Sequence, residues 1–479
     1  MEWRTAIAKH HVSDSTPASK TVLKERRADA RVLPWLFSLL IVVCALCLPV
    51  TALAADDPQI QGTAALLVEP ETGTVLYEKN ADEQRYPASM TKIMTALVVL
   101  ENAQLTDQVT MTDADFAGLP VDSSMAGFEP GETLTVEELL YGLLLPSGNE
   151  ASYALARYVG GGSVDTFVQM MNDKAAELGC DHTHFVNPCG LHDPNHYTTA
   201  RDLYRIMSAA MENETFAKIV ATPVYNMPAT NLQQAREIKN SNELLDKESS
   251  AYLASANGIK SGNTYEAGRC LAASAATDNM KLYSVVMGCA DVPYGETPPS
   301  MTESKRLLEW GFANYANTTV VEEGEEVKVQ LVTDSADNQT LSIVANNSLV
   351  EPLPSDINTD DIVATYDLPD EYVAPIEQGT YLGTVTYTYN DEVLGEVDLV
   401  AGNDVEISPI ALVRNTLHGV LSNRNLMIGV AGGVVALVVL VVSLCVWRHI
   451  RRRNAGSHSA ASSPKKGTKS SSGGSHMRS

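Results

Sequence analysis

Two kinds of hydrophobic pattern run along the chain, and each predicts a different element. In residues 63–78, TAALLVEPETGTVLYE, two short apolar runs flank a Glu-Thr-Gly turn, which predicts a β-hairpin. In residues 86–101, YPASMTKIMTALVVLE, apolar positions recur at helical spacing behind Pro87. That spacing predicts a buried helix that begins near Ser89.

A short polar turn joins two further helical patterns. Thr135 caps a predicted helix that ends at Pro146, and a new helical pattern starts directly after Ser147, Gly148 and Asn149. Such a turn can hold two polar side chains at a fixed angle over a cleft. Serine, glycine and asparagine are also ordinary turn formers, so an unremarkable turn is the alternative.

Strand patterns dominate the later part of the chain. A turn at residues 257–258 leads into a predicted strand at 259–262, and residues 268–289 predict a hairpin that turns near 278–279. Short alternating runs then predict a small all-β domain over residues 317–407. Because this domain contains no candidate nucleophile, we expect it to act as a spacer or to bind a partner.

The start of the chain has the pattern of a secretory signal. Residues 1–54 combine a long basic leader with an apolar run at 33–54 that ends in the small-residue sequence Ala-Leu-Ala. Pro49 interrupts the run, which favours cleavage by a signal peptidase. An uncleaved membrane anchor is the alternative.

A second apolar run, residues 426–447, is long enough at helical rise to cross a bilayer. Arg448 and the three arginines at 451–453 follow it, so the positive-inside rule predicts a cytoplasmic tail at 448–479 and an extracellular location for the domains before the helix. The tail is rich in Ser, Gly and Lys, and we expect it to be disordered. Residues 408–425 would link the β-rich domain to this helix.

Composition narrows the class of partner. The chain has 479 residues, enough for two or three domains, and a formal net charge of −25. An acidic chain argues against nucleic acid as a partner and indicates little else beyond solubility.

Four cysteines lie outside the apolar segments: Cys180, Cys189, Cys270 and Cys289. The hairpin predicted at 268–289 sets Cys270 almost opposite Cys289, so a disulfide there, with a second between Cys180 and Cys189, is one prediction. Four buried thiols are the alternative.

A cluster of histidines suggests a metal site at first sight. The cluster consists of His182, His184, His192 and His196, with Asp181 and Asp193. Its spacings match no standard zinc pattern, and the prolines and glycine among these residues favour a structured loop. We therefore predict no metal and no cofactor.

The predicted helix at residues 86–101 places Ser89 and Lys92 three residues apart on one face. A serine needs a base to act as a nucleophile, and a lysine desolvated among apolar side chains loses its proton more easily. The same spacing recurs by chance in the tail, at Ser462 and Lys465. A capping serine beside a solvated lysine is therefore the alternative interpretation.

The predicted strand at 259–262 also has a structural and a functional interpretation. An exposed Lys260 on an edge strand often serves only to discourage aggregation. Beside Ser261 and Gly262, it can instead offer a cation and a hydroxyl to an anionic ligand that runs along the strand. Gly262 would let that ligand approach closely.

Taken together, these motifs resemble a known family. Ser89 with Lys92, the Ser-Gly-Asn turn at 147–149 and the Lys-Ser-Gly strand at 260–262 match the three motifs of the penicillin-binding serine enzymes and serine β-lactamases. The surrounding segments, among them YPASMTKIMTALVVLE and NGIKSGNT, resemble the low-molecular-weight D-alanyl-D-alanine carboxypeptidases. The likeness covers roughly residues 58–316, within a catalytic domain expected at 56–316.

The resemblance implies a fold and a mechanism. The fold would be α+β, with an antiparallel sheet flanked by helices as in the β-lactamase/transpeptidase-like enzymes. Ser89 would attack the bond between the two terminal D-alanines of a peptidoglycan stem peptide, and Lys92 would accept its proton. Penicillin and other β-lactams would acylate the same serine.

The remaining motif residues take supporting roles in this resemblance. Ser147 would relay a proton to the leaving D-alanine, and Asn149 would orient Lys92 and the substrate. Lys260 and Ser261 would hold the terminal carboxylate, beside Gly262. Backbone N–H groups of Ser89 and Asn263 would form the oxyanion hole.

Two positions depart from the family pattern, and other functions remain open. Ser261 stands where threonine is commoner, and Asn257 where aspartate is frequent. A serine β-lactamase, a D,D-endopeptidase on the same scaffold and a penicillin sensor are the alternatives. The absence of an obvious glutamate-bearing loop argues against the first, and the short tail argues against the last. We predict a membrane-anchored, exported bacterial carboxypeptidase.

Overall fold

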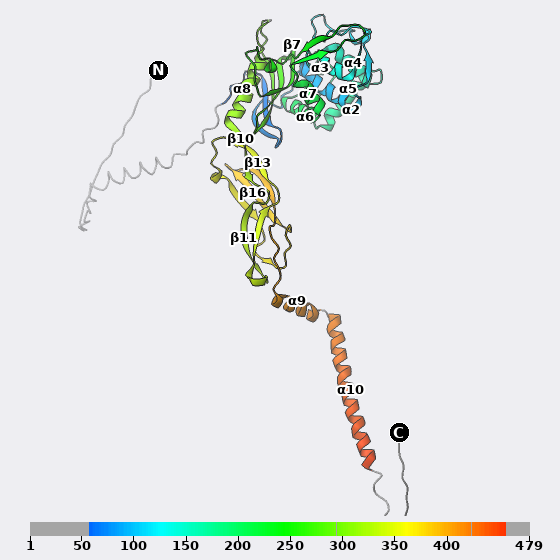
Figure 1. The fold of residues 1–479 in the computed structure, drawn as a ribbon, viewed down its shortest axis with the longest axis vertical. Helices are drawn as coiled ribbons and strands as arrows, with labels where there is room; N and C mark the ends of the chain where they lie inside the picture. Colours follow the sequence, from blue (N-terminus) through cyan, green and yellow to red (C-terminus); the bar gives the residue numbers. More distant parts are fainter. Residues whose placement is uncertain (1–56, 294, 423, 457–479) are drawn as a thin grey trace, which may run out of the picture. The chain divides into compact units, whose positions relative to one another are not determined.

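The computed structural model describes residues 57–293, 295–422 and 424–456 (Figure 1). The predicted leader and signal at 1–54 and the tail from 457 onward lie outside the described residues.

A five-stranded antiparallel sheet forms the centre of the first domain. Its strands, in the order β2-β1-β9-β8-β7, are β1 (Ala64–Glu69), β2 (Thr74–Lys79), β7 (Ala256–Thr264), β8 (Gly268–Ala276) and β9 (Lys281–Cys289). The predicted hairpins β1–β2 and β8–β9 are confirmed, and β7 is an edge strand.

Helices cover both faces of this sheet (Figure 1). One face packs against the 3₁₀ helix η1 (Ala88–Thr91) and helices α2 (Lys92–Asn102), α3 (Val136–Leu144), α4 (Asn149–Val159), α5 (Val164–Glu177), α6 (Ala200–Met211) and α7 (Glu214–Val220). The other face packs against α8 (Pro299–Asn314). Short strand pairs complete the domain: β3 (Gln108–Thr110) with β4 (Thr133–Thr135), and β5 (Val224–Met227) with β6 (Arg236–Lys239). The predicted α+β class is confirmed.

Helix α2 lies at the centre of the larger core. Every residue from Lys92 to Val99 is buried, so this helix has no solvent face over its first two turns. The helix predicted to begin near Ser89 is continuous with η1, which holds Ser89 itself. Thr135 caps α3 as predicted, in a capping box with Glu138, and α3 ends just before Pro146.

The all-β prediction for the next part of the chain is confirmed, with its own hydrophobic core. Strands β10 (Tyr315–Val321) and β13 (Leu349–Pro354) form one pair. The six-stranded sheet has the order β14-β16-β17-β12-β11-β15, with β11 (Glu326–Thr333), β12 (Thr340–Ala345), β14 (Val363–Asp367), β15 (Tyr372–Val373), β16 (Tyr381–Tyr389) and β17 (Glu392–Ala401).

Two helices end the described part of the chain. The segment predicted as a linker holds α9 (Pro409–Ser422), and α10 (Arg424–Gly456) follows. Within the described residues, α10 is the one helix long and apolar enough to cross a bilayer, over Arg424–Arg452. The prediction of disorder from residue 448 onward is wrong for its first residues, because α10 continues to Gly456.

The predicted disulfides are wrong. Cys180, Cys189, Cys270 and Cys289 are all buried free thiols. A bulge in the β8–β9 pairing lies between Arg269 and Leu271, and it places Cys270 and Cys289 in separate cores on opposite faces of the sheet. The Cys270 thiol instead accepts a hydrogen bond from the backbone N–H of Gly288 at 3.5 Å.

Candidate active site

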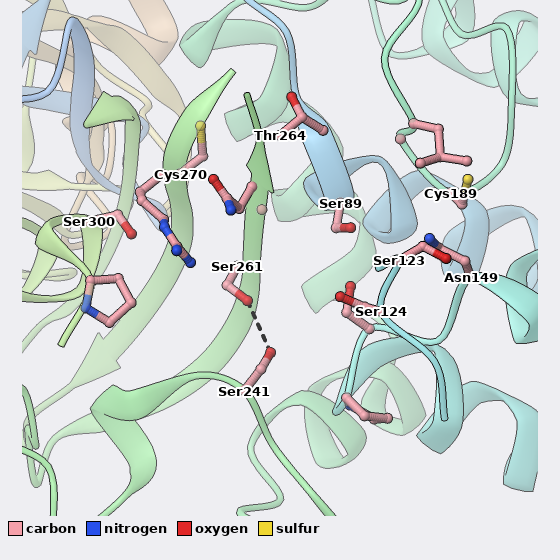
Figure 2. A pocket seen from close by; sticks show the side chains of 18 of the residues that line it. Ser89, Ser123, Ser124, Asn149, Cys189, Ser241, Ser261, Thr264, Cys270 and Ser300 are labelled. Atoms are coloured by element: carbon pink, nitrogen blue, oxygen red, sulfur yellow. Dashed lines mark hydrogen bonds between the residues drawn. The ribbon is translucent and has the colours of Figure 1, made fainter. Parts of the chain in front are cut away.

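Ser89 is presented on η1, immediately before α2. Its neighbours Ala88 and Met90 are buried and fix the turn, while Ser89 is itself partly exposed. Figure 2 shows its hydroxyl in the space between the strand that bears Ser261 and the segment that bears Asn149. The nucleophile candidate therefore lies on a rigid support and faces an open space.

Lys92 is fully buried and is held by three oxygen atoms. Its Nζ donates to Ser89 Oγ at 2.9 Å, to Asn149 Oδ1 at 2.7 Å and to the carbonyl oxygen of Cys189 at 2.7 Å. Burial lowers the pKa of Lys92 to about 8, although Cys189 and Glu150 nearby oppose the shift. A lysine with this pKa is partly neutral near neutral pH and can accept a proton from Ser89.

The turn between α3 and α4 brings Ser147 and Asn149 to the same place. Ser147 has a positive φ of 69°, an uncommon conformation for a residue with a side chain. Its hydroxyl is buried and has no hydrogen-bond partner among the described residues. A side chain at Gly148 would lie 2.8 Å from Gly142 O and from the Ala126 side chain, so only glycine fits there.

Strand β7 carries the third motif, and here one expectation is wrong. Lys260 is 1% exposed rather than solvated, and its Nζ donates to the carbonyl oxygen of Ser261 at 3.0 Å. Burial and the nearby Lys92 lower the pKa of Lys260 well below its usual value. Gly262 allows close packing against η1, because a Cβ there would lie 2.9 Å from Pro87 O.

These elements enclose one cavity of about 980 Å³ (Figure 2). Six residues predicted from the sequence to form the site line it: Ser89, Ser147, Asn149, Ser261, Gly262 and Asn263. Lys92 and Lys260 lie behind this wall. The structure thus brings all three motifs together, although they are far apart in the sequence.

Several residues at the site carried no sequence signal. Ser241 lines the cavity, and its hydroxyl lies 3.0 Å from that of Ser261 (Figure 2). Cys189 contributes through its backbone carbonyl, which any residue supplies. Glu150 is completely buried and accepts hydrogen bonds from the N–H groups of Ala126 and Gly127. Contacts of this kind depend on the tertiary fold rather than on local spacing.

The histidine cluster belongs to a structured loop. The imidazole Nε2 of His196 lies 2.8 Å from Oγ1 of Thr91, the last residue of η1, so this buried side chain helps to hold η1 in place. The described residues include no group of three or more His, Cys, Asp or Glu side chains arranged to hold a metal ion.

Comparison with known proteins matches most of the chain. Residues 51–291 match the peptidase S11 family of D-alanyl-D-alanine carboxypeptidases, and residues 315–407 match the C-terminal domain of penicillin-binding protein 5. The chain is 32% identical over 363 residues to D-alanyl-D-alanine carboxypeptidase DacF of Bacillus subtilis (strain 168), which covers 72% of this chain and 86% of the relative. It is 33% identical over 356 residues to D-alanyl-D-alanine carboxypeptidase DacA of Haemophilus influenzae. That match covers 73% of this chain and 86% of the relative.

A solved structure agrees with these matches. Penicillin binding protein 5 from Haemophilus influenzae is similar to this chain with a TM-score of 0.58 and 32% sequence identity. The match covers 74% of this chain and 100% of that one. The similarity extends over the sheet, its helices and the β-rich domain, so the predicted β-lactamase/transpeptidase-like fold is confirmed.

Proposed function

The chain belongs to the D-alanyl-D-alanine carboxypeptidase family of penicillin-binding serine enzymes, and we propose that it shortens peptidoglycan stem peptides through an acyl-enzyme on Ser89. The observation that carries this assignment of residues is the position of Lys92, buried and 2.9 Å from Ser89 Oγ. A neutral lysine at this distance is a competent general base.

The first half of the reaction forms the acyl-enzyme. Neutral Lys92 takes the proton of Ser89 Oγ as the oxygen attacks the carbonyl between the two terminal D-alanines. The N–H groups of Ser89 and Asn263 hold the developing oxyanion. Ser147, whose buried hydroxyl lacks a partner in the described structure, relays the proton from protonated Lys92 to the amine of the leaving D-alanine, so that Lys92 is neutral again.

Hydrolysis of the acyl-enzyme releases the shortened peptide. Asn149 keeps Lys92 in place through its Oδ1, so that Lys92 activates the incoming water as it activated the serine. Ser261 contacts the terminal carboxylate of the substrate during binding. Lys260 contributes to this subsite through its hydrogen bond to the Ser261 backbone rather than by direct contact.

Release of free D-alanine tests this proposal. The purified full-length protein in detergent is incubated with a synthetic stem pentapeptide that ends in D-Ala-D-Ala. We expect release from the wild type, none from Ser89→Ala, and wild-type release from Ser250→Ala, whose exposed hydroxyl lies 3.1 Å from that of Thr297 and does not line the cavity. Folded protein that labels with penicillin but releases no D-alanine would reject the carboxypeptidase proposal for this peptide.

Two alternative activities predict different results with two further substrates, a cross-linked peptide dimer and penicillin. A D,D-endopeptidase would cleave a cross-linked peptide dimer faster than the pentapeptide. A β-lactamase would hydrolyse penicillin with rapid turnover instead of retaining it as a long-lived adduct. We expect slow loss of the penicilloyl adduct and preference for the pentapeptide.

We further propose the arrangement of the chain in the cell. The catalytic domain at 56–316 and the β-rich domain at 317–407 lie outside the membrane, and the apolar part of α10 at 426–447 crosses it. The basic tail at 448–479 lies in the cytoplasm, which follows from the arginines after the apolar run. A tag after residue 479 that reacts with an impermeant reagent in intact cells would contradict this orientation.

A further inference from the structure

Neither Lys260, which was expected to bind a substrate carboxylate, nor Lys92, the expected base, faces the cavity. Lys92 and Lys260 are 0% and 1% exposed, and neither lines the cavity wall. The ammonium of Lys260 is engaged with the Ser261 carbonyl oxygen. A carboxylate that enters the cavity therefore needs another positive group at its surface.

The charged side chains of the cavity wall are mostly acidic. Carboxylates of Asp122, Glu243, Asp246 and Glu266 line it. Among the described residues that line the cavity, Arg269 is the only permanently charged cation. An anionic ligand in this surrounding is repelled unless Arg269 offsets the acidic groups.

Arg269 is placed next to the third motif. It lies on β8 directly opposite Asn263 of β7, and Asn263 is two residues from Ser261 on the same strand. Residues two apart on a strand share a face, and opposed residues have Cβ atoms about 5 Å apart. A guanidinium at this position can reach a carboxylate that Ser261 also contacts.

The guanidinium of Arg269 is already paired with an acid. Its Nε and Nη2 both lie 2.7 Å from Oδ1 of Asp291, which follows β9. The two side chains are 27% and 69% exposed, respectively. Exposed ion pairs of this kind are weak and exchange readily for another anion of better geometry.

We propose that Arg269 binds the C-terminal carboxylate of the substrate and that Asp291 competes with that carboxylate for the guanidinium. The inference rests on the proposed function, because it concerns the same substrate end. A planar guanidinium can donate two parallel N–H···O bonds, one to each oxygen of a carboxylate, whereas here Nε and Nη2 both lie against the single oxygen Oδ1 of Asp291. The substrate carboxylate can therefore bind Arg269 with better geometry than Asp291 does. The strength of the Arg269–Asp291 ion pair sets how much binding free energy the substrate carboxylate must supply to displace Asp291.

Peptides with and without the terminal charge separate this role from a structural one. The wild type and Arg269→Gln are assayed with the D-Ala-D-Ala pentapeptide and with the same peptide ending in D-alaninamide. Loss of a charged hydrogen bond predicts a rise of about tenfold or more in KM for the acid and less than about twofold for the amide. Equal changes for both peptides would overturn the proposal.

Substitution of Asp291 should change KM in the opposite direction. We expect Asp291→Asn to lower KM for the acid peptide by a few fold, because the competing anion is gone. The double variant Arg269→Gln/Asp291→Asn should match Arg269→Gln alone. An increase in KM in Asp291→Asn would show that this aspartate supports the site instead of competing, and would overturn the proposal. Arg201→Gln, which breaks an exposed ion pair with Asp82 away from the cavity, is the matched control.

Acylation by benzylpenicillin and by its methyl ester gives an independent readout. The acid form should acylate Ser89 more slowly in Arg269→Gln than in the wild type, with the ester unaffected. This assay needs no peptide hydrolysis. A wild type that is acylated but releases no D-alanine would reject the proposed function, while the acid-to-ester ratio would still decide the role of Arg269.

Discussion

Lys92 Nζ lies 2.9 Å from Ser89 Oγ, and the two residues are joined by less than one turn of chain. The serine stands on a 3₁₀ helix and is partly exposed, whereas the lysine begins α2 and is completely buried. One local step from η1 to α2 thus separates a partly exposed hydroxyl from a fully buried amine. The low pKa of Lys92 follows from that burial.

The first prediction concerns the pH dependence of acylation. Lys92 acts as a base only when neutral, and its pKa is about 8. Below that value the neutral fraction falls about tenfold for each pH unit, so the acylation rate should rise about tenfold per unit from pH 6 and level off above about pH 8. Stopped-flow measurement with a fluorescent penicillin checks this. A rate that does not change between pH 6 and 9 would show that Lys92 is not the base.

Local patterns were sufficient to locate the motifs. The spacing of Ser89 and Lys92 follows from helix geometry, and the Thr135 cap with Pro146 set the bounds of α3 before the Ser-Gly-Asn turn. Each of these features depends on residues a few positions apart. Sequence was therefore informative where the chemistry is local.

Tertiary contacts decided the features that sequence did not reveal. An edge strand normally exposes its lysines, but η1 packs against β7 and buries Lys260. The pairing of Cys270 with Cys289 was wrong because of one bulge, and such a bulge reverses which face a side chain takes. Ser241 comes from a loop between β6 and β7, which no motif marks.

The second prediction concerns Ser241. The hydroxyls of Ser241 and Ser261 are 3.0 Å apart, and serine at 261 lacks the methyl group that restricts a threonine side chain. Ser241→Ala should raise KM for the pentapeptide by about fivefold, which corresponds to one hydrogen bond. In a Ser261→Ala background the same change should have no further effect. Additive effects in the double variant would contradict the coupling.

The third prediction concerns Glu150. This buried carboxylate accepts hydrogen bonds from the Ala126 and Gly127 N–H groups at 2.7 and 2.9 Å and so ties the loop before β4 to α4. Glu150→Ala leaves buried donors without partners and should reduce the free energy of unfolding by about 3 kcal/mol. Glu150→Gln retains an acceptor oxygen and should reduce the free energy of unfolding by about half of that amount.

Chemical denaturation of the two Glu150 variants tests this prediction. Partly exposed Glu137 on α3 is a suitable control, because its Ala variant removes a carboxylate that contacts only the exposed Lys218 among the described residues and frees no buried donor. Equal losses for Glu150→Ala and Glu150→Gln would mean that the charge, rather than the acceptor, holds the loop.

The last prediction concerns stability in acid. Burial lowers the pKa of His196 to about 4, below its ordinary value of 6.5. Between these values the unfolded chain binds a proton that the folded chain does not, so stability falls as the pH falls through this window, by an amount on the order of 3 kcal/mol. His196→Gln can keep the contact with Thr91 but does not titrate, and it should remove this part of the pH dependence. Melting temperatures of the wild type, His196→Gln and the exposed control His182→Gln between pH 4 and 7 measure the effect. If His196→Gln and His182→Gln both retain the wild-type slope, protonation of His196 does not limit acid stability, and the support that it gives to η1 persists in the charged form.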